Sequence, residues 1–255
     1  MPLVPSRAST QPRADVVATY RYGDAECLWR LLRHVPATWD VRAWALDRPH
    51  PSLVQVTVGS GPTEGCDPLQ RLLVSTELTE HRWLVVVQRP VALRGGLAGL
   101  VSTAAAANLD LVMPAHRRVS RHRFVLPRHR VGAIARRTSY VEWSPVSAVA
   151  PDWRARVLDV VDSHPRITVD IELSRLAADG LRLGVVDRTP MLALDWPPEP
   201  SADAFAELER RLESYHVVSP TLLQRVDAVQ WCAGTWWFGS SQPPWSRHRR
   251  TIVQP

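Results

Sequence analysis

The sequence contains no lysine, and all 31 residues counted as lysine plus arginine are arginine. This usage is typical of a high-GC coding sequence, and it also suits phosphate recognition, because the guanidinium fork matches phosphate oxygens. The net charge of +6 fits an acidic ligand such as a diphosphate. Since the sequence shows no nucleic-acid-binding motif, we do not expect a nucleic-acid partner.

Cysteine is scarce as well. The chain has three cysteines, without CxxC spacing and far apart, at Cys27, Cys66 and Cys232. This pattern argues against a disulfide framework and a cysteine zinc site. It favours a reducing, cytoplasmic compartment, and the N-terminus lacks the apolar core of a signal peptide. The most apolar segment, residues 91–113, is interrupted by Arg94, Asn108 and Asp110, so we expect no transmembrane segment.

What is present indicates one α/β domain with an extension, because the chain has 255 residues and is 45% hydrophobic. Strands are predicted at residues 15–20, 41–46, 53–58, 84–88, 109–113, 138–143, 146–150, 167–171 and 182–186. Helices are predicted at residues 25–34, 67–73, 97–107, 152–161, 174–179 and 202–215. This order predicts a doubly wound, mostly parallel sheet over residues 15–194.

Two flanking segments have a different composition. Residues 1–14 hold three prolines and are predicted to be disordered. Residues 195–255 are predicted to form a C-terminal extension, with a linker, an amphipathic helix and a tryptophan-rich basic tail. Tryptophans of this kind more often pack in a core or an interface than form a ligand platform. Residues 117–137 are read as a basic loop, either a solvated surface or a lid over phosphate.

The stretch from Trp83 to Gly96 organises the chain. Leu84 to Val87 are apolar and mostly β-branched, which is typical of a strand buried on both faces in a parallel sheet. Pro90 cannot continue a central strand. Gln88 and Arg89 therefore follow the carboxyl end of a central strand, the edge at which open α/β sheets bind ligands.

Short blocks on both sides of this strand carry a resemblance. They are residues 43–47, 57–62, 83–87, 114–116, 137–142 with Pro145, and 184–187 with Thr189 and Pro190. Their order and spacing resemble a family of bacterial GT-A-fold, nucleotide-diphospho-sugar transferase-like proteins. The resemblance implies a GT-A-type sheet, a sugar-nucleotide ligand and a divalent metal held by an acidic run after the central strand.

The chain departs from that family at both metal-ligand positions. It has Gln88, Arg89 and Pro90 where the family has its acidic run, and no histidine follows Thr189 and Pro190. Mg²⁺ and Mn²⁺ prefer carboxylate oxygens, which this sequence lacks there. We therefore predict a degenerate DXD motif, with no bound metal and no other cofactor.

The resemblance places nucleotide or substrate contacts at the strand ends. Tyr20 and Arg21 end the first strand, where a tyrosine can stack on a base and an arginine can meet phosphate; ordinary turn packing is the alternative. Asp47 can bond a ribose hydroxyl. The remaining candidates follow the third and fourth strands: Gly59, Ser60, Gly61, Gln88 and Arg89. Glycines there let backbone approach a ligand closely.

Four acid–base candidates are Asp170, Glu172, Glu142 and His116. The resemblance implies a general base for the acceptor hydroxyl near Asp170. If 167–171 is a strand, Asp170 and Glu172 face the same way and converge; a helix-capping role is the alternative. Glu142 lies between Val141 and Trp143, where burial would make it a general acid, or it pairs with Arg137. His116 can act as base or ligand, or be structural.

Three functions remain open. The leading one is glycosyl transfer, or a related reaction on a sugar-nucleotide-like small molecule, in bacterial envelope or natural-product biosynthesis. The fold can instead serve a cyclisation or rearrangement of a natural-product intermediate. It can also serve a non-catalytic partner that binds or regulates another protein, because fold alone does not decide function.

Overall fold

The computed structural model describes residues 12–62, 67–75, 81–116, 128–143, 145–164, 166–192, 226–231 and 236–238, with residues 206, 210, 211, 213 and 214. The predicted disorder of residues 1–14 falls almost wholly outside this set. Most of the predicted linker, helix 202–215 and tail also fall outside it, although the five isolated residues between 206 and 214 are helical.

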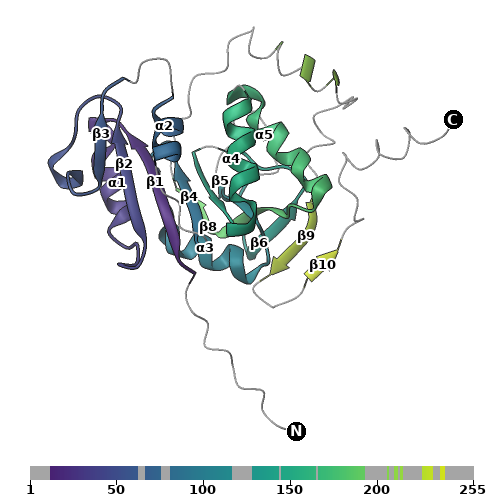
Figure 1. The fold of residues 1–255 in the computed structure, drawn as a ribbon. Coiled ribbons are helices and arrows are strands. Elements are labelled where there is room, and N and C mark those ends of the chain that lie inside the picture. The colour runs from purple at the N-terminus through teal and green to yellow at the C-terminus, as the bar shows by residue number, and fades with distance from the viewer. Residues whose placement is uncertain are drawn as a thin grey trace.

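The described strands form one sheet in the order β10-β9-β6-β8-β5-β7-β4-β1-β2-β3 (Figure 1). Their bounds are β1 Ala14–Tyr20, β2 Asp40–Ala45, β3 Thr57–Ser60, β4 Trp83–Val87, β5 Leu111–His116, β6 Ala133–Thr138, β7 Val146–Val149, β8 Leu183–Met191, β9 Val226–Trp231 and β10 Trp236–Phe238. Strands β6, β7 and β10 run against the others. The sheet is therefore mixed but mostly parallel, which confirms the predicted α/β class.

Helices cover both faces of the sheet. They are α1 Ala25–Leu32, α2 Pro68–Ser75, α3 Gly96–Ala106, α4 Arg154–Ser163 and α5 Arg166–Arg175, with 3-10 turns at Tyr22–Asp24, Pro51–Leu53, Pro151–Trp153 and Leu176–Asp179. Helices α1 and α3 pack on one face, and α2, α4 and α5 pack on the other. None of these described helices is long and apolar enough to cross a membrane.

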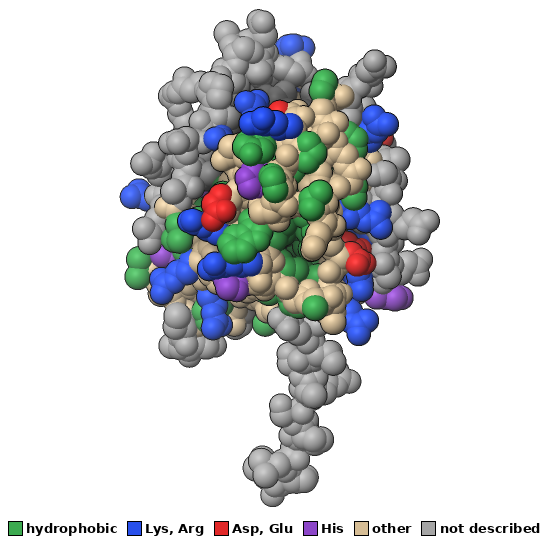
Figure 2. Space-filling model, turned by 90° about the vertical axis from the view of Figure 1, so that its left-hand side faces the viewer, with side chains coloured by type: hydrophobic (Ala, Val, Ile, Leu, Met, Phe, Trp, Pro, Cys, Tyr) green, Lys and Arg blue, Asp and Glu red, His purple; other side chains and the backbone are tan. Residues whose placement is uncertain are grey.

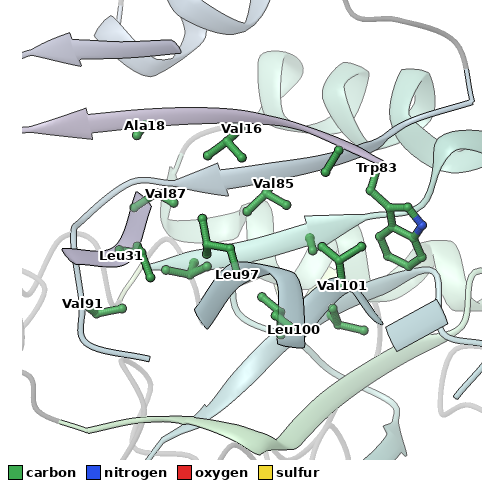
Figure 3. Close-up of a cluster of buried hydrophobic side chains, with 14 of the residues drawn as sticks. Val16, Ala18, Leu31, Trp83, Val85, Val87, Val91, Leu97, Leu100 and Val101 are labelled. Atoms are coloured by element: carbon green, nitrogen blue, oxygen red, sulfur yellow. The ribbon is translucent and has the colours of Figure 1, made fainter. Parts of the chain in front are cut away.

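Alternation along the central strands assigns side chains to the two faces. Val85 and Val87 of β4 pack with Leu97 and Leu100 of α3 (Figure 3), whereas Leu84 and Val86 pack in the cluster on the opposite face. Every residue of β1 and β4 is buried. Since each fully buried Val or Leu contributes about 1.5–3 kcal/mol, this double cover fixes the strand register.

One end of the sheet is formed by the short strand β3. Figure 2 views the molecule from the side of Figure 1 on which β3 lies, and shows hydrophobic side chains with arginine side chains around them. Val54 and Val58 are among the exposed large hydrophobic residues there, at 63% and 55%. A four-residue edge strand offers few unpaired backbone groups, which limits pairing with another chain.

The prediction of a strand at residues 167–171 is wrong, because these residues lie in the helix α5. Thr168 and Val169 are β-branched and favour a strand by local propensity. Val169 and Leu173, however, are four residues apart and pack in the same core cluster against the sheet. Tertiary packing of this helical face overrides the weak local preference.

Other boundaries also differ from the sequence prediction. The strand expected at 138–143 is displaced to β6, so that Arg136 and Arg137 belong to a strand rather than to a basic loop. The strand expected at 53–58 starts only at Thr57, after a 3-10 turn. Strands β9 and β10 were not predicted. Strand β9 pairs with β6, and β10 pairs with β9, which extends the sheet into the region assigned to the tail.

Candidate functional site

The candidate site lies at the carboxyl edge of the sheet, where β1, β2, β3, β4, β5 and β8 end and the antiparallel β7 begins. The order β3-β2-β1-β4 places β2 on one side of β1 and β4 on the other. The chain therefore changes direction across the sheet between β1 and β4. Open α/β sheets bind ligands outside such a point.

Gln88 is held in place by β1 on one side of β4 and by the loop before β7 on the other. The Thr19 hydroxyl donates to the Gln88 carbonyl at 2.8 Å, and the Gln88 N–H donates to the Pro145 carbonyl at 2.9 Å. The Gln88 side-chain Nε2 donates to the Trp143 carbonyl at 2.9 Å. The amide oxygen of Gln88 is then left as an acceptor at this edge.

A pocket of about 140 Å³ lies beside Gln88, between β4, α2, α4 and α5. Leu69, Val161 and Val169 line it with apolar side chains, together with Trp143. Its polar lining comes from Asp67, Gln70, Gln88, Asp162, His164 and Asp170. The Gln70 amide donates to the Asp162 carboxylate, which ties α2 to α4 at the wall.

Asp170 reaches this pocket from α5. It is 1% exposed, and its Oδ1 accepts the Trp143 N–H at 2.8 Å, while its Oδ2 accepts a longer bond of 3.4 Å from the Tyr140 hydroxyl. The carboxylate is thus oriented by the loop that precedes β7. A helix, rather than the expected strand, brings it to the carboxyl edge.

Glu172 does not join Asp170 in the pocket lining. Its carboxylate accepts from Arg175 at 3.0 Å and from Arg211 at 2.7 Å. The expectation that the two acidic residues converge is wrong, because residues two apart on a helix point to different sides. Glu172 instead connects α5 to one of the described residues of the C-terminal region.

His116 and Glu142 are buried near the same edge, outside the pocket lining. His116 ends β5 and is 2% exposed, and burial lowers its pKa to about 3. The imidazole is therefore neutral at pH 7. Glu142 is 1% exposed, in the loop before β7, and its N–H donates to the Met113 sulfur at 3.1 Å. Their acid–base roles stay predictions.

Tyr20 is a core residue at the end of β1. Its ring packs in the cluster on the α1 face, and its hydroxyl bonds with the Thr57 hydroxyl at 2.9 Å and accepts the His50 N–H at 3.3 Å. The aromatic ring at this strand end that is not fully buried is Tyr22, which the sequence analysis did not select. The Arg48 guanidinium lies 4.0 Å from its centroid.

Asp47 organises the neighbouring end of β2. Its carboxylate accepts the Arg48 N–H at 2.7 Å and the Tyr22 N–H at 2.9 Å. These backbone hydrogen bonds, that from Arg48 first, lower the pKa of the Asp47 carboxyl. Arg21 and Arg89 follow β1 and β4, and their side chains make no hydrogen bond or ion pair with another described residue.

The glycines near β3 have a packing reason. A Cβ at Gly59 would lie 2.3 Å from the Trp44 ring, and the Trp44 Nε1 donates to the Gly61 carbonyl at 3.0 Å. Gly61 has φ +86°, which favours glycine. The close neighbour of this Gly59-Ser60-Gly61 segment in the structure is Trp44, and ligand contact there stays a prediction.

Sequence reasoning missed a buried ion pair between β6 and β8. Arg136 Nε lies 2.7 Å from Asp187 Oδ2, and Arg136 Nη2 lies 3.0 Å from Asp187 Oδ1. Both side chains are about 1% exposed or less. The signal was hidden because Arg136 was read as part of a basic loop. In the structure Arg136 lies opposite Val185 of β8, and two-residue alternation along β8 puts Asp187 on the same side as Val185.

The residues at the edge do not form a divalent-metal site of the kind the resemblance implies. Gln88 offers one neutral oxygen and Arg89 offers none. Within the described ranges, no group of three or more His, Cys, Asp or Glu side chains is placed to hold a metal ion. We therefore derive no chemical step through a metal.

Comparisons with known proteins give little beyond this geometry. No family model and no curated protein matches the chain. Among solved structures, the chain is similar to CMP:2-keto-3-deoxy-manno-octonic acid synthetase complexed with CTP, at 13% identity and a TM-score of 0.37, over 80% of this chain and 99% of that one. A likeness this distant carries no argument about the function of this chain.

Proposed function

We propose that this chain binds a sugar-nucleotide-like ligand at the carboxyl edge of β1, β2 and β4, and transfers its sugar or performs related chemistry without a divalent metal. The pathway would be bacterial envelope or natural-product biosynthesis. The observation that carries the proposal is the pocket lined by Gln88, Trp143 and Asp170 beside the β1–β4 reversal point.

Arginines at three strand ends supply charge for a diphosphate. Arg21 follows β1, Arg48 follows β2 and Arg89 follows β4. Guanidinium groups bind phosphate oxygens through paired hydrogen bonds and stay charged at all physiological pH values. Arg21 and Arg89 have no competing ion pair among the described residues. They are therefore available for the negative charge that a metal would otherwise neutralise.

The pocket is too small to bind the donor and the acceptor together. Pockets for whole drug-sized ligands measure roughly 300–1,000 Å³, and this one measures about 140 Å³. It holds a single ring. The nucleotide then lies along the strand ends, and the pocket takes the acceptor.

Asp170 is the proposed general base. As the acceptor oxygen bonds to the anomeric carbon, a carboxylate oxygen of Asp170 takes the hydroxyl proton. The bond from the anomeric carbon to the diphosphate oxygen breaks, and the diphosphate leaves with the electron pair. The backbone N–H of Trp143 holds the Asp170 carboxylate at 2.8 Å for this role. A positioned base contributes roughly 10²- to 10⁴-fold in rate.

A rearrangement or cyclisation is the second candidate. The apolar wall of Leu69, Val161 and Val169 favours an apolar ring, and Glu142 is a buried carboxyl nearby in the chain before β7. In that reaction Glu142 would serve as the acid. Loss of activity in Glu142→Gln with retained activity in Asp170→Asn would favour this candidate.

A nucleotide panel tests the leading proposal. We expect nucleoside diphosphates and their sugar conjugates to raise the melting temperature in buffer containing EDTA. Arg89→Ala should weaken this shift. Arg13→Ala is the matched control, because Arg13 is exposed and precedes β1 at the opposite edge of the sheet. If no nucleotide produces a saturable shift, the nucleotide-sugar proposal fails.

A further inference from the structure

The pocket beside Gln88 is acidic in a protein rich in arginine. Asp67, Asp162 and Asp170 line it, and no arginine is among its lining residues in the described part of the chain. His164 is the one lining side chain there that can carry positive charge. The lining therefore opposes the net charge of +6 of the whole chain.

The polar atoms of the wall are mostly hydrogen-bond acceptors. The side-chain amide of Gln88 donates to the Trp143 carbonyl, so the amide oxygen of Gln88 remains as an acceptor. Oδ1 of Asp162 accepts a hydrogen bond from the Gln70 amide, and Oδ2 of Asp162 has no partner among the described residues. Asp67 accepts the Leu69 N–H at 3.0 Å. A ligand that binds against this wall forms the most hydrogen bonds if it carries donor groups.

One buried donor belongs to the same wall. Trp143 is 5% exposed, and its indole Nε1 is buried with no hydrogen-bond partner among the described residues. Trp143 also contributes to the pocket lining with the apolar side chains of Leu69, Val161 and Val169. A buried indole N–H normally has a partner. Because it is a donor, the ligand group that satisfies it must be an acceptor, such as a hydroxyl or ring oxygen, and not an ammonium group.

We infer that this pocket is a subsite for a ring that bears a protonated amine, and that it excludes phosphate and carboxylate groups. The assignment to the acceptor, rather than the donor, rests on the proposed function. Carboxyl groups at the wall attract an ammonium group and repel an anion, because like charges placed together oppose binding. The donor diphosphate then stays with Arg21, Arg48 and Arg89 outside the pocket.

Three probes of equal shape test the inference: cyclohexylamine, cyclohexanol and cyclohexanecarboxylate. Each carries one six-membered ring, and they differ in the charge of one substituent. Dissociation constants are measured by NMR titration of the full-length protein at pH 7. We expect the amine to bind at least about tenfold more tightly than the carboxylate, with the alcohol between them.

Charge-removing variants locate the binding. Asp162→Asn should weaken cyclohexylamine about threefold, the effect of one exposed ion pair, and leave cyclohexanol unchanged. Asp159→Asn is the control, because Asp159 is exposed on the same helix and outside the pocket lining. Equal weakening by both variants would overturn the assignment. Tighter binding of the carboxylate, or no saturable binding of the amine, would also overturn it.

The two proposals fail separately. If nucleotides bind and the amine does not, the subsite inference is wrong and the proposed function stands. If the amine binds with the Asp162 dependence and no nucleotide binds, the subsite stands and the nucleotide-sugar proposal is wrong.

Discussion

The hydroxyl of Thr19 donates a 2.8 Å hydrogen bond to the backbone carbonyl of Gln88. This bond joins the ends of β1 and β4, on either side of the point where the chain reverses its direction across the sheet. Gln88 in turn bonds through its side chain to Trp143, in the loop that orients Asp170. The position of the pocket wall therefore depends on a side chain that is 4% exposed and does not line the pocket.

We predict that Thr19→Val lowers the free energy of unfolding by about 1 kcal/mol, the usual contribution of one hydrogen bond. Valine keeps the shape and removes the donor. Thr19→Ser keeps the hydroxyl and should retain most of the stability. Urea unfolding measures both variants, and a Thr19→Val protein as stable as the wild type would show that the bond contributes nothing.

Asp170→Asn should lower turnover roughly 10²- to 10⁴-fold, because it removes the proposed base. The amide oxygen of asparagine can still accept the Trp143 N–H, so we expect the fold and donor binding to remain. Turnover of a donor identified in the nucleotide panel gives the measurement. Near-normal turnover would reject Asp170 as the base. A variant that fails to fold would indicate a structural role, which circular dichroism would reveal.

The Arg136–Asp187 pair yields a stability prediction. Arg136→Met leaves a buried carboxylate without its bidentate partner, which costs about 3–5 kcal/mol. Arg137→Met is the control, because Arg137 is the next residue of β6 and is exposed. Adding Asp187→Leu to Arg136→Met should recover part of the loss. Equal unfolding midpoints for Arg136→Met and Arg137→Met would contradict the role of the buried pair.

Because His116 is buried, we predict that the folded protein loses stability in acid. Burial lowers its pKa from 6.5 to about 3, so between these values the unfolded chain binds a proton that the folded protein does not. Stability from this group is complete above pH 6.5 and declines as the pH falls toward 3, by up to about 1.4 kcal/mol per pH unit.

The measurement for His116 is the difference between two proteins. The free energy of unfolding is followed by urea titration at several pH values between 6.5 and 4, in wild type and His116→Gln. The variant should show a shallower pH dependence in this window, because its side chain does not titrate. Parallel curves for the two proteins would contradict the pKa shift.

The central strands and their order in the chain could be predicted because burial on both faces leaves a distinct signature. Leu84 to Val87 form an apolar β-branched run, and Pro90 stops the strand before the edge. The positions of Gln88 and Arg89 at that edge followed from this. Residues 166–175 could not be predicted, because their helix depends on packing of Val169 and Leu173 against distant strands.

The candidate site was predicted only in part for the same reason. Asp170 reaches the carboxyl edge as the sequence predicted, but on a different element. Two features of the pocket could not be predicted: Trp143 lines it, and Asp162 lies close to Gln70. Both depend on contacts between α2, α4 and the loop before β7, which no local sequence pattern encodes. Tyr22 was overlooked because Tyr20, two residues earlier, carries the same side chain but packs into the core.

The most direct test of the central claim is an NMR titration of protein labelled at the tryptophan indole nitrogen, in buffer containing EDTA. The Trp143 signal is assigned by its loss in Trp143→Phe. We predict that a sugar conjugate of a nucleoside diphosphate shifts this signal saturably, because its sugar must lie beside the acceptor pocket that Trp143 lines with Gln88 and Asp170. An unchanged Trp143 signal throughout the nucleotide panel would contradict a sugar-nucleotide site at this edge.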